Sequence, residues 1–226
     1  MNLAKLILFD IDGTLVDTGG AGARSWAWAF ERLFDRRIDI AEHSTAGMTD
    51  PAIGRTTFTE AMEREPTEEE LTRLMAAYQS VLPDYVASSP DYCVLDGVGE
   101  LLERLTEAGV LLGLTTGGLE AVAHAKLGRG RLNHFFLVGG YGSDSEDRTE
   151  LTRTAVDRGR SMLDAPLDLG EVFVVGDTPL DIAAAEGVGA VSVGVASGRY
   201  GVEELRAAGA DHVLASLADT FPPGPG

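Results

Sequence analysis

Four short runs of apolar residues recur along the chain, each bounded by Gly, Asp or Thr. Strands that are apolar on both faces are typical of a parallel sheet covered by helices. The pattern therefore predicts a sheet whose strands are spread over most of the chain. The four runs cover residues 5–9, 110–114, 172–175 and 190–195, and two weaker runs cover residues 135–138 and 212–214.

Between these runs the apolar positions follow a helical spacing. Residues 98–108 place Val, Leu and Ala on one helical face, and Gly109 is expected to end that helix. This alternation predicts an α/β fold, a doubly wound and mostly parallel sheet with a Rossmann-like core. Ligands bind such sheets beyond the carboxyl ends of the strands, where the strand order reverses.

Residues 18–84 break this alternation, because they contain three helical patterns and no convincing strand. The third pattern opens at Thr67 with Glu70 three positions later, the spacing of a capping box. We predict an inserted helical cap over residues 18–84, with residues 1–17 and 85–226 forming the α/β core. The alternative is that these helices pack directly on the same core.

The composition is that of a folded soluble protein, with 44% apolar and 24% charged residues among 226. A net charge of −18 would repel nucleic acids and anionic membranes, so neither is an expected partner. An anionic substrate would be repelled as well. A phosphate site would therefore need a metal ion, backbone N–H groups or a few placed cations.

Further features of the sequence bear on the cellular compartment, the oligomeric state and the C-terminal tail. The single cysteine, Cys93, excludes an internal disulfide, and the first apolar run meets Asp10 too early for a signal peptide. We therefore expect a cytoplasmic protein, and either a monomer or a homodimer, because no exposed apolar stripe stands out. The Pro- and Gly-rich residues 221–226 are expected to form a disordered tail.

Two acids follow the first predicted strand directly. In extended geometry Asp10 and Asp12 point to the same side, with Ile11 opposite. Gly13 then allows a tight turn whose backbone N–H groups could face an anion. Two carboxylates at one place favour a bound cation.

The ends of two other strands carry matching chemistry. Residues 172–175 lead into Asp177 and Asp181, and residues 110–114 lead into Thr115 and Thr116. If these strands are parallel neighbours, the side chains meet at one edge of the sheet. Carboxylates and a hydroxyl suit a hard cation such as Mg²⁺, whereas zinc is disfavoured because no His or Cys cluster lies nearby. Each acid alone could instead cap a turn or a helix.

This order of motifs resembles the haloacid dehalogenase superfamily, in its phosphatase branch, and within it phosphoglycolate phosphatase-like enzymes with a helical cap. The motif DxDGTxxD matches residues 10–17, and GDxxxD matches residues 176–181. The strand that ends in Thr or Ser matches Thr116, with Thr115 as the competing register. Where the family usually has a Lys before a helix, this chain has Arg148, and Lys126 is the alternative.

The resemblance implies a two-step phosphoryl transfer. Asp10 is expected to be the nucleophile, and Asp12 the general acid and base. Mg²⁺ would be held by Asp10, the backbone carbonyl of Asp12 and Asp177, with Asp181 orienting them from behind. The phosphate would be bound by a further set of groups: Thr116, the N–H of Gly117, Arg148 and the main chain around Gly13.

The cap is expected to select the substrate. Residues 19–22 are interpreted as a hinge, and residues 47–51 as a loop that faces the pocket, with Thr49 as a contact. Arg24 and Arg55 are the cap cations that could bind substrate, although each could equally be a solvated charge on a helix surface.

The sequence thus predicts a Mg²⁺-dependent phosphatase that acts on a small phosphorylated metabolite. A phosphosugar mutase on the same core and a non-catalytic phosphate-binding protein are the alternatives. A dehalogenase is disfavoured by the acid at Asp12, and a phospho-accepting receiver domain lacks both the DxDGT spacing and the cap.

Overall fold

The computed structural model describes residues 4–222 and contains one central parallel sheet. Its six strands lie in the order β5-β4-β1-β6-β7-β8, and all neighbouring pairs are parallel. The predicted α/β class with a Rossmann-like core is confirmed. The strands are β1 Leu6–Phe9, β4 Leu111–Thr116, β5 Val138–Tyr141, β6 Val172–Gly176, β7 Val191–Val195 and β8 His212–Leu214.

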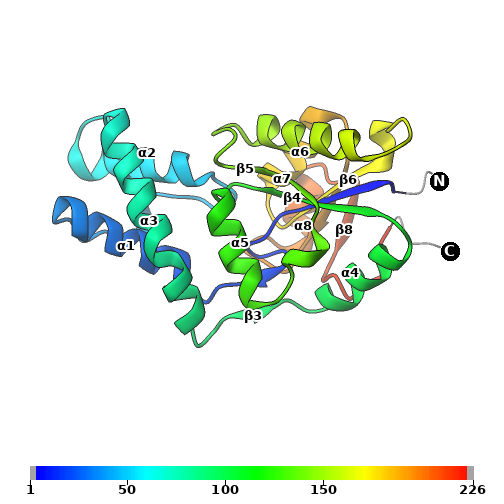
Figure 1. The fold of residues 1–226 in the computed structure, drawn as a ribbon, viewed down its shortest axis with the longest axis horizontal. Helices are drawn as coiled ribbons and strands as arrows, with labels where there is room; N and C mark the ends of the chain where they lie inside the picture. The colour runs from blue at the N-terminus through cyan, green and yellow to red at the C-terminus, as the bar shows by residue number, and fades with distance from the viewer. Residues whose placement is uncertain (1–3, 223–226) are drawn as a thin grey trace.

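Helices cover both faces of the sheet, which explains why the strands are apolar throughout. Ile7 and Phe9 of β1 pack with α4 and α5, whereas Leu6 and Leu8 pack with α6 and α7 on the opposite face. Figure 1 shows α6 on one side of the sheet and α4 and α5 on the other. The helices are α4 Val98–Glu107, α5 Glu120–Arg129, α6 Arg148–Met162, α7 Pro179–Val188 and α8 Val202–Ala207.

The strand order reverses beside β1, which makes this the topological switch point of the sheet. Strands β4 and β5 extend the sheet on one side of β1, and β6, β7 and β8 extend it on the other. Phe9 is aligned with Leu114 of β4 and with Val175 of β6. The residues that follow these three strands therefore lie together, at the place where sheets of this kind bind ligands.

Three helices between β2 and β3 form a second group at one end of the molecule, on the left in Figure 1. They are α1 Ala21–Phe34, α2 Asp50–Met62 and α3 Glu68–Ser88, with the short helix η1 Ile40–Glu42. They share a core that includes Trp26 stacked on Tyr78 at 4.2 Å, and this core also includes Leu119 and Val122 at the start of α5. We call residues 18–88 the cap segment.

Local signals explain the limits of several elements. The predicted capping box between Thr67 and Glu70 is present at the start of α3, and Gly109, with φ of +76°, follows α4 as expected. Helix α3 runs past residue 84, where the cap was expected to end. The cap segment joins the core next to a small antiparallel pair that the sequence did not reveal, β2 Val16–Asp17 and β3 Cys93–Val94.

Two local predictions differ from the structure. Residues 135–138 were expected to form a strand, but Phe135 ends the short helix η2 Asn133–Phe135 and β5 starts at Val138. Residues 221–226 were expected to form a disordered tail, but Phe221 is buried and its ring lies 6.5 Å from that of Phe9. Residues 223–226 lie outside the described part of the chain.

The remaining short helix, η3, covers Leu169–Glu171 and leads into β6. Within residues 4–222, every helix is too short or too polar to cross a membrane.

Candidate active site

Asp10 follows β1 directly and is buried at the carboxyl edge of the sheet. Its backbone N–H donates to the Val175 carbonyl at 2.8 Å, which continues the pairing of β1 with β6. Its side chain is only 8% exposed, and Oδ1 accepts a hydrogen bond from Arg148 Nη2 at 2.8 Å. A buried guanidinium therefore fixes the orientation of this carboxyl group.

Asp12, two residues further along, has different surroundings. Its side chain is 49% exposed, and its Oδ2 lies 2.5 Å from Lys126 Nζ of α5. Burial would lower the pKa of Lys126, but the neighbouring carboxylates of Asp12 and Asp50 outweigh it, so the pKa is raised and the lysine stays charged. The two cations considered as alternatives are thus both in the site, Arg148 beside Asp10 and Lys126 beside Asp12.

The end of β4 distinguishes between the two threonines. Thr116 borders the cavity described below, and its Oγ1 accepts a hydrogen bond from the Gly118 N–H at 3.2 Å. The Thr115 side chain points to the other face, where its hydroxyl shares a hydrogen bond of 2.7 Å with that of Thr152 in α6. Thr116 is therefore the threonine that can meet a ligand.

Gly13 closes the turn after Asp12 with φ of +79°. A Cβ at this position would lie 2.5 Å from Asp177 Oδ2, so any other side chain would collide with that carboxylate. The turn also contacts the loop after β7, because the Ser197 hydroxyl donates to the Gly13 carbonyl at 2.7 Å. The glycine thus lets the backbone of the first motif approach Asp177 closely.

Asp10, Asp177 and Asp181 bring carboxylate oxygens within 4.8 Å of one another. Burial raises the pKa of Asp10 to about 7, although the neighbouring Arg148 opposes this shift. Burial, and then the charges of Asp10 and Asp181, raise the pKa of Asp177 to about 8. Carboxylates this close repel one another when they are ionised, and a cation among them offsets that repulsion. The oxygen-only donor set fits a hard divalent cation.

Asp181 differs from Asp177 in how well its oxygens are already satisfied. Its Oδ2 accepts hydrogen bonds from the Thr178 N–H at 3.1 Å and the Thr178 hydroxyl at 2.7 Å, and its Oδ1 accepts from Arg148 Nε at 3.0 Å. Asp177 Oδ1 accepts a long hydrogen bond of 3.4 Å from the Thr14 hydroxyl. Asp181 therefore orients Arg148, and Asp177 keeps oxygens that a cation can use.

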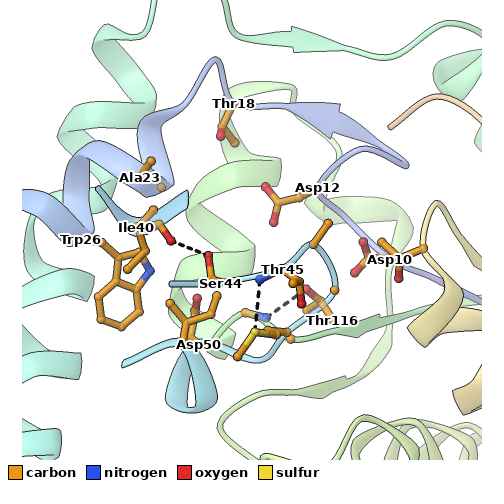
Figure 2. Close-up of a pocket in the computed structure, with 18 of the residues that line it drawn as sticks. Asp10, Asp12, Thr18, Ala23, Trp26, Ile40, Ser44, Thr45, Asp50 and Thr116 are labelled. Carbon is orange, nitrogen blue, oxygen red and sulfur yellow. Dashed lines mark hydrogen bonds between the residues drawn. The ribbon is translucent and has the colours of Figure 1, made fainter. Parts of the chain in front are cut away.

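A cavity of about 340 Å³ extends from these acids into the cap segment. Figure 2 shows Asp10 and Asp12 on one side of it and Trp26 and Ile40 on the other. Its core wall includes Thr116, Gly117, Lys126 and Arg148, and the loop after β7 adds Arg199. This volume lies near the lower end of those usual for small-molecule sites.

The three cap residues predicted to contact substrate, Arg24, Thr49 and Arg55, are not among the residues that line this cavity. Arg24 donates to the Gly19 carbonyl at 2.7 Å and to the Ser89 hydroxyl at 3.1 Å, whereas Arg55 pairs with Glu146 of the core at 3.0 Å. The Thr49 hydroxyl donates to the Glu146 carbonyl at 3.2 Å. Arg55 and Thr49 therefore hold the cap segment against the core, and Arg24 fixes the entry into α1.

Sequence reasoning missed Asp50, a buried acid that borders the cavity from the cap segment. Its Oδ2 accepts a hydrogen bond from the Leu119 N–H at 2.9 Å, and its own N–H donates to the Gly117 carbonyl at 2.8 Å. The loop of residues 47–51 was correctly expected to face the pocket. Asp50 is the only charged residue of that loop and directly follows Thr49, the N-cap of α2, so its presence there was the available signal for a charged contact.

The fold and the site together define a doubly wound α/β protein with aspartates at the sheet switch point and a helical cap. Residues 4–189 match the family model of haloacid dehalogenase-like hydrolases. The probable phosphatase IndB of Dickeya dadantii is 29% identical over 91% of this chain and 87% of its own. The pyrophosphatase PpaX of Listeria monocytogenes is 26% identical over 94% of this chain and 93% of its own.

A solved structure of a hydrolase from Pseudomonas syringae has a TM-score of 0.72 and 25% identity, covering 96% of this chain and 95% of that one. This chain belongs to the haloacid dehalogenase-like hydrolases, and its relatives place it among their phosphatases.

Proposed function

We propose that this phosphatase depends on Mg²⁺ and hydrolyses a small phosphorylated metabolite through an aspartyl-phosphate on Asp10. One observation carries the proposal: two carboxylates after the same strand have opposite surroundings. Asp10 is buried and held by Arg148, as suits a nucleophile with a fixed direction of attack. Asp12 faces the cavity beside Lys126, where it can exchange protons with a substrate or with water.

The first step forms the bond between a carboxylate oxygen of Asp10 and phosphorus. The bond from phosphorus to the leaving oxygen breaks, and Asp12 donates its proton to that oxygen. In the second step Asp12 takes a proton from water, and the water oxygen attacks phosphorus. The bond to Asp10 then breaks, which releases inorganic phosphate and restores both carboxyl groups.

The remaining residues bind and orient the phosphate. Asp10, the backbone carbonyl of Asp12 and Asp177 would hold Mg²⁺, whose charge offsets the charge of the phosphate and the nucleophile. The Thr116 hydroxyl and the Gly117 N–H would bind phosphate oxygens. Arg148 contributes charge at the same place, because its guanidinium already bridges Asp10, Asp181 and the cap segment at the Gly47 carbonyl.

The proposal is tested by phosphate release from an aryl phosphate, measured with Mg²⁺ and with EDTA. Wild type should turn over only with the metal, and Asp10→Asn should be inactive. Asp164→Asn removes the same charge from an exposed position outside the site and should remain active. Metal-independent hydrolysis, or turnover by purified Asp10→Asn, would show that the proposed chemistry is wrong.

The covalent intermediate has its own test. Asp12→Asn lacks both the acid of the first step and the base of the second, so the substrate is a nitrophenyl phosphate, whose leaving group needs no proton. Enzyme quenched during its turnover should carry a phosphoryl group on the peptide that contains Asp10. Mass spectrometry of the digested protein measures this. A phosphosugar mutase would share the intermediate but pass the phosphoryl group to a sugar, so stoichiometric release of inorganic phosphate distinguishes the two activities.

A further inference from the structure

The charge that the cap segment brings to the cavity is negative. Arg24 and Arg55 are engaged elsewhere, as described above. Among the described residues 4–222, Asp50 is the only charged side chain of the cap segment that borders the cavity. In Figure 2 it lies among cap residues such as Ser44 and Ile40, across from Asp12. The part of a substrate that extends from the phosphate site into the cap therefore meets a carboxylate.

Asp50 is rigidly held in this position. It is only 5% exposed, and both its backbone and its carboxylate are tied to the β4–α5 loop through Gly117 and Leu119. The neighbouring Tyr78 ring is stacked on Trp26 and fully buried. Burial raises the pKa of Asp50 to about 6, with Lys126 opposing the shift, so the group is mainly ionised above neutral pH.

The nearby cation does not cancel this charge. Lys126 lies against Asp12 at 2.5 Å and is influenced by both Asp12 and Asp50, so one positive charge serves two carboxylates. Asp12, Asp50 and Lys126 together therefore carry a net negative charge when all three are ionised. A second anionic group on the substrate would lie near the buried Asp50 carboxylate, where like charges repel more strongly than in bulk water.

The polar groups on this wall also accept hydrogen bonds. The Asp50 carboxylate accepts hydrogen bonds from the Leu119 N–H and from the Tyr78 hydroxyl, and an ionised carboxylate has further lone pairs that can accept another. The Ser44 hydroxyl donates its proton to the Ile40 carbonyl at 2.8 Å, which leaves its oxygen as an acceptor. Beside them, Trp26 and Ile53 offer apolar surface. The wall thus suits a carbon skeleton that carries hydroxyl or amino donors.

We infer that Asp50 is a specificity-determining residue, which selects phosphate monoesters with a neutral or cationic, donor-bearing leaving group and rejects those with a second anionic group. This inference rests on the proposed phosphatase activity. It differs from the expectation that cap cations recognise the substrate. Arg199, exposed at the mouth of the cavity on the core side, is the residue that would favour the opposite selectivity.

Matched substrates test the inference directly. Glycerol phosphate and phosphoglycerate differ by a hydroxymethyl group against a carboxylate, and phosphoethanolamine and phosphoglycolate differ by an aminomethyl group against a carboxylate. The neutral or cationic member of each pair should have a kcat/KM at least about tenfold higher in wild type. Where turnover is slow, inhibition constants against aryl phosphate hydrolysis should show the same order.

Asp50→Asn should lower each preference roughly tenfold, mainly through better use of the anionic member. A ratio of two substrates on one preparation is independent of the folded fraction, so partial misfolding of the variant does not affect it. Glu42→Gln removes the same charge from an exposed cap position and should leave the ratios unchanged.

Two results would overturn the inference. The first is equal or higher kcat/KM for the carboxylates in wild type, and the second is an unchanged ratio in Asp50→Asn. If wild type prefers the carboxylates and Arg199→Ala loses that preference, Arg199 and not Asp50 determines the selectivity. If aryl phosphate is still hydrolysed with Mg²⁺ in these cases, only the inference about Asp50 fails. Absence of that hydrolysis would remove the proposed function together with the inference that rests on it.

Discussion

At the scale of single residues, the site works by giving similar side chains different neighbours. Asp10 and Asp12 both follow β1, but one is buried against a guanidinium and the other faces the cavity beside an ammonium group. Arg148 presents several donors in a fixed plane, so it can hold Asp10, Asp181 and the Gly47 carbonyl at once. A lysine carries its three donors on one nitrogen atom, so it lacks the spacing with which Nε, Nη1 and Nη2 of Arg148 meet these partners.

Asp12→Asn tests the role of the cavity-facing carboxyl. The amide can neither donate the proton to the leaving group nor accept one from water. Steady-state turnover should therefore fall by about 10² to 10⁴, the usual contribution of general acid–base catalysis. The thermal unfolding midpoint should stay close to that of wild type, since the side chain is half exposed. Turnover near the wild-type rate would exclude the role assigned to Asp12.

Lys126→Met should affect substrates according to their leaving group. Lys126 binds Asp12, which protonates the leaving oxygen, so the substitution should lower kcat/KM for an alkyl phosphate far more than for a nitrophenyl phosphate. The nitrophenolate leaves without a proton. Arg148→Met should instead reduce kcat/KM for both substrates alike, because it disturbs the nucleophile. If Lys126→Met lowered kcat/KM equally for the alkyl phosphate and the nitrophenyl phosphate, Lys126 would not act through Asp12.

At the scale of elements, the sheet was predictable and its details were not. Strands buried on both faces leave a strong local signal, and residues 110–114 and 172–175 were placed within two residues of β4 and β6. β5 was misplaced because two of its residues are glycines. A Cβ at Gly140 would lie 1.9 Å from the Leu151 carbonyl, so the close approach of α6 requires a residue that weakens the strand signal.

The β4–α5 loop of the core also packs tightly against residues 48–49 of the cap segment. Gly117 is the closest point, because a Cβ there would lie 2.5 Å from the Met48 carbonyl and 2.9 Å from Thr49 Cα. Gly118, the next residue, has no neighbour nearer than 3.5 Å to such a Cβ. Adjacent glycines therefore differ in whether a methyl group would hold the cap away from the core.

Gly117→Ala should consequently displace the cap segment from its position on the core, whereas Gly118→Ala should not. We expect kcat/KM for aryl phosphate to fall by about 10²-fold in Gly117→Ala, since a displacement of about 1 Å at a reacting site has effects of that size. Thermal unfolding would confirm that both variants are folded. Equal activity of the two variants would show that contact between this loop and residues 48–49 is not needed for turnover.

At the scale of the whole molecule, contacts between segments far apart in sequence determine which cap residues face the cavity, and local sequence patterns do not reveal these contacts. The aspartates of the core could be identified because Asp10 and Asp177 each follow a strand directly, and Asp12 and Asp181 complete the same two motifs. Arg24 and Arg55 could not be placed, because their partners Ser89 and Glu146 come from segments that meet them only after folding. Asp50 was missed for the same reason, since its burial depends on the docking of α2 against the β4–α5 loop.

The same assembly gathers buried acids in a protein whose net charge is already −18. Asp10 and Asp177 destabilise the folded state when both are ionised, and a bound divalent cation removes this cost. Mg²⁺ should therefore raise the unfolding midpoint. At a concentration about 100 times the dissociation constant the gain is about 2.7 kcal/mol, which corresponds to roughly 5–10 °C for a chain of this length.

Asp177→Asn separates this effect from general salt stabilisation. The substitution removes a ligand and one buried charge, so without metal the variant should unfold at a higher temperature than wild type above pH 8, where Asp177 is ionised. Its midpoint should no longer respond to Mg²⁺. Calorimetry at constant ionic strength, with NaCl replacing MgCl₂, measures both effects. An equal Mg²⁺ shift in wild type and Asp177→Asn would place the stabilising cation elsewhere on the acidic surface.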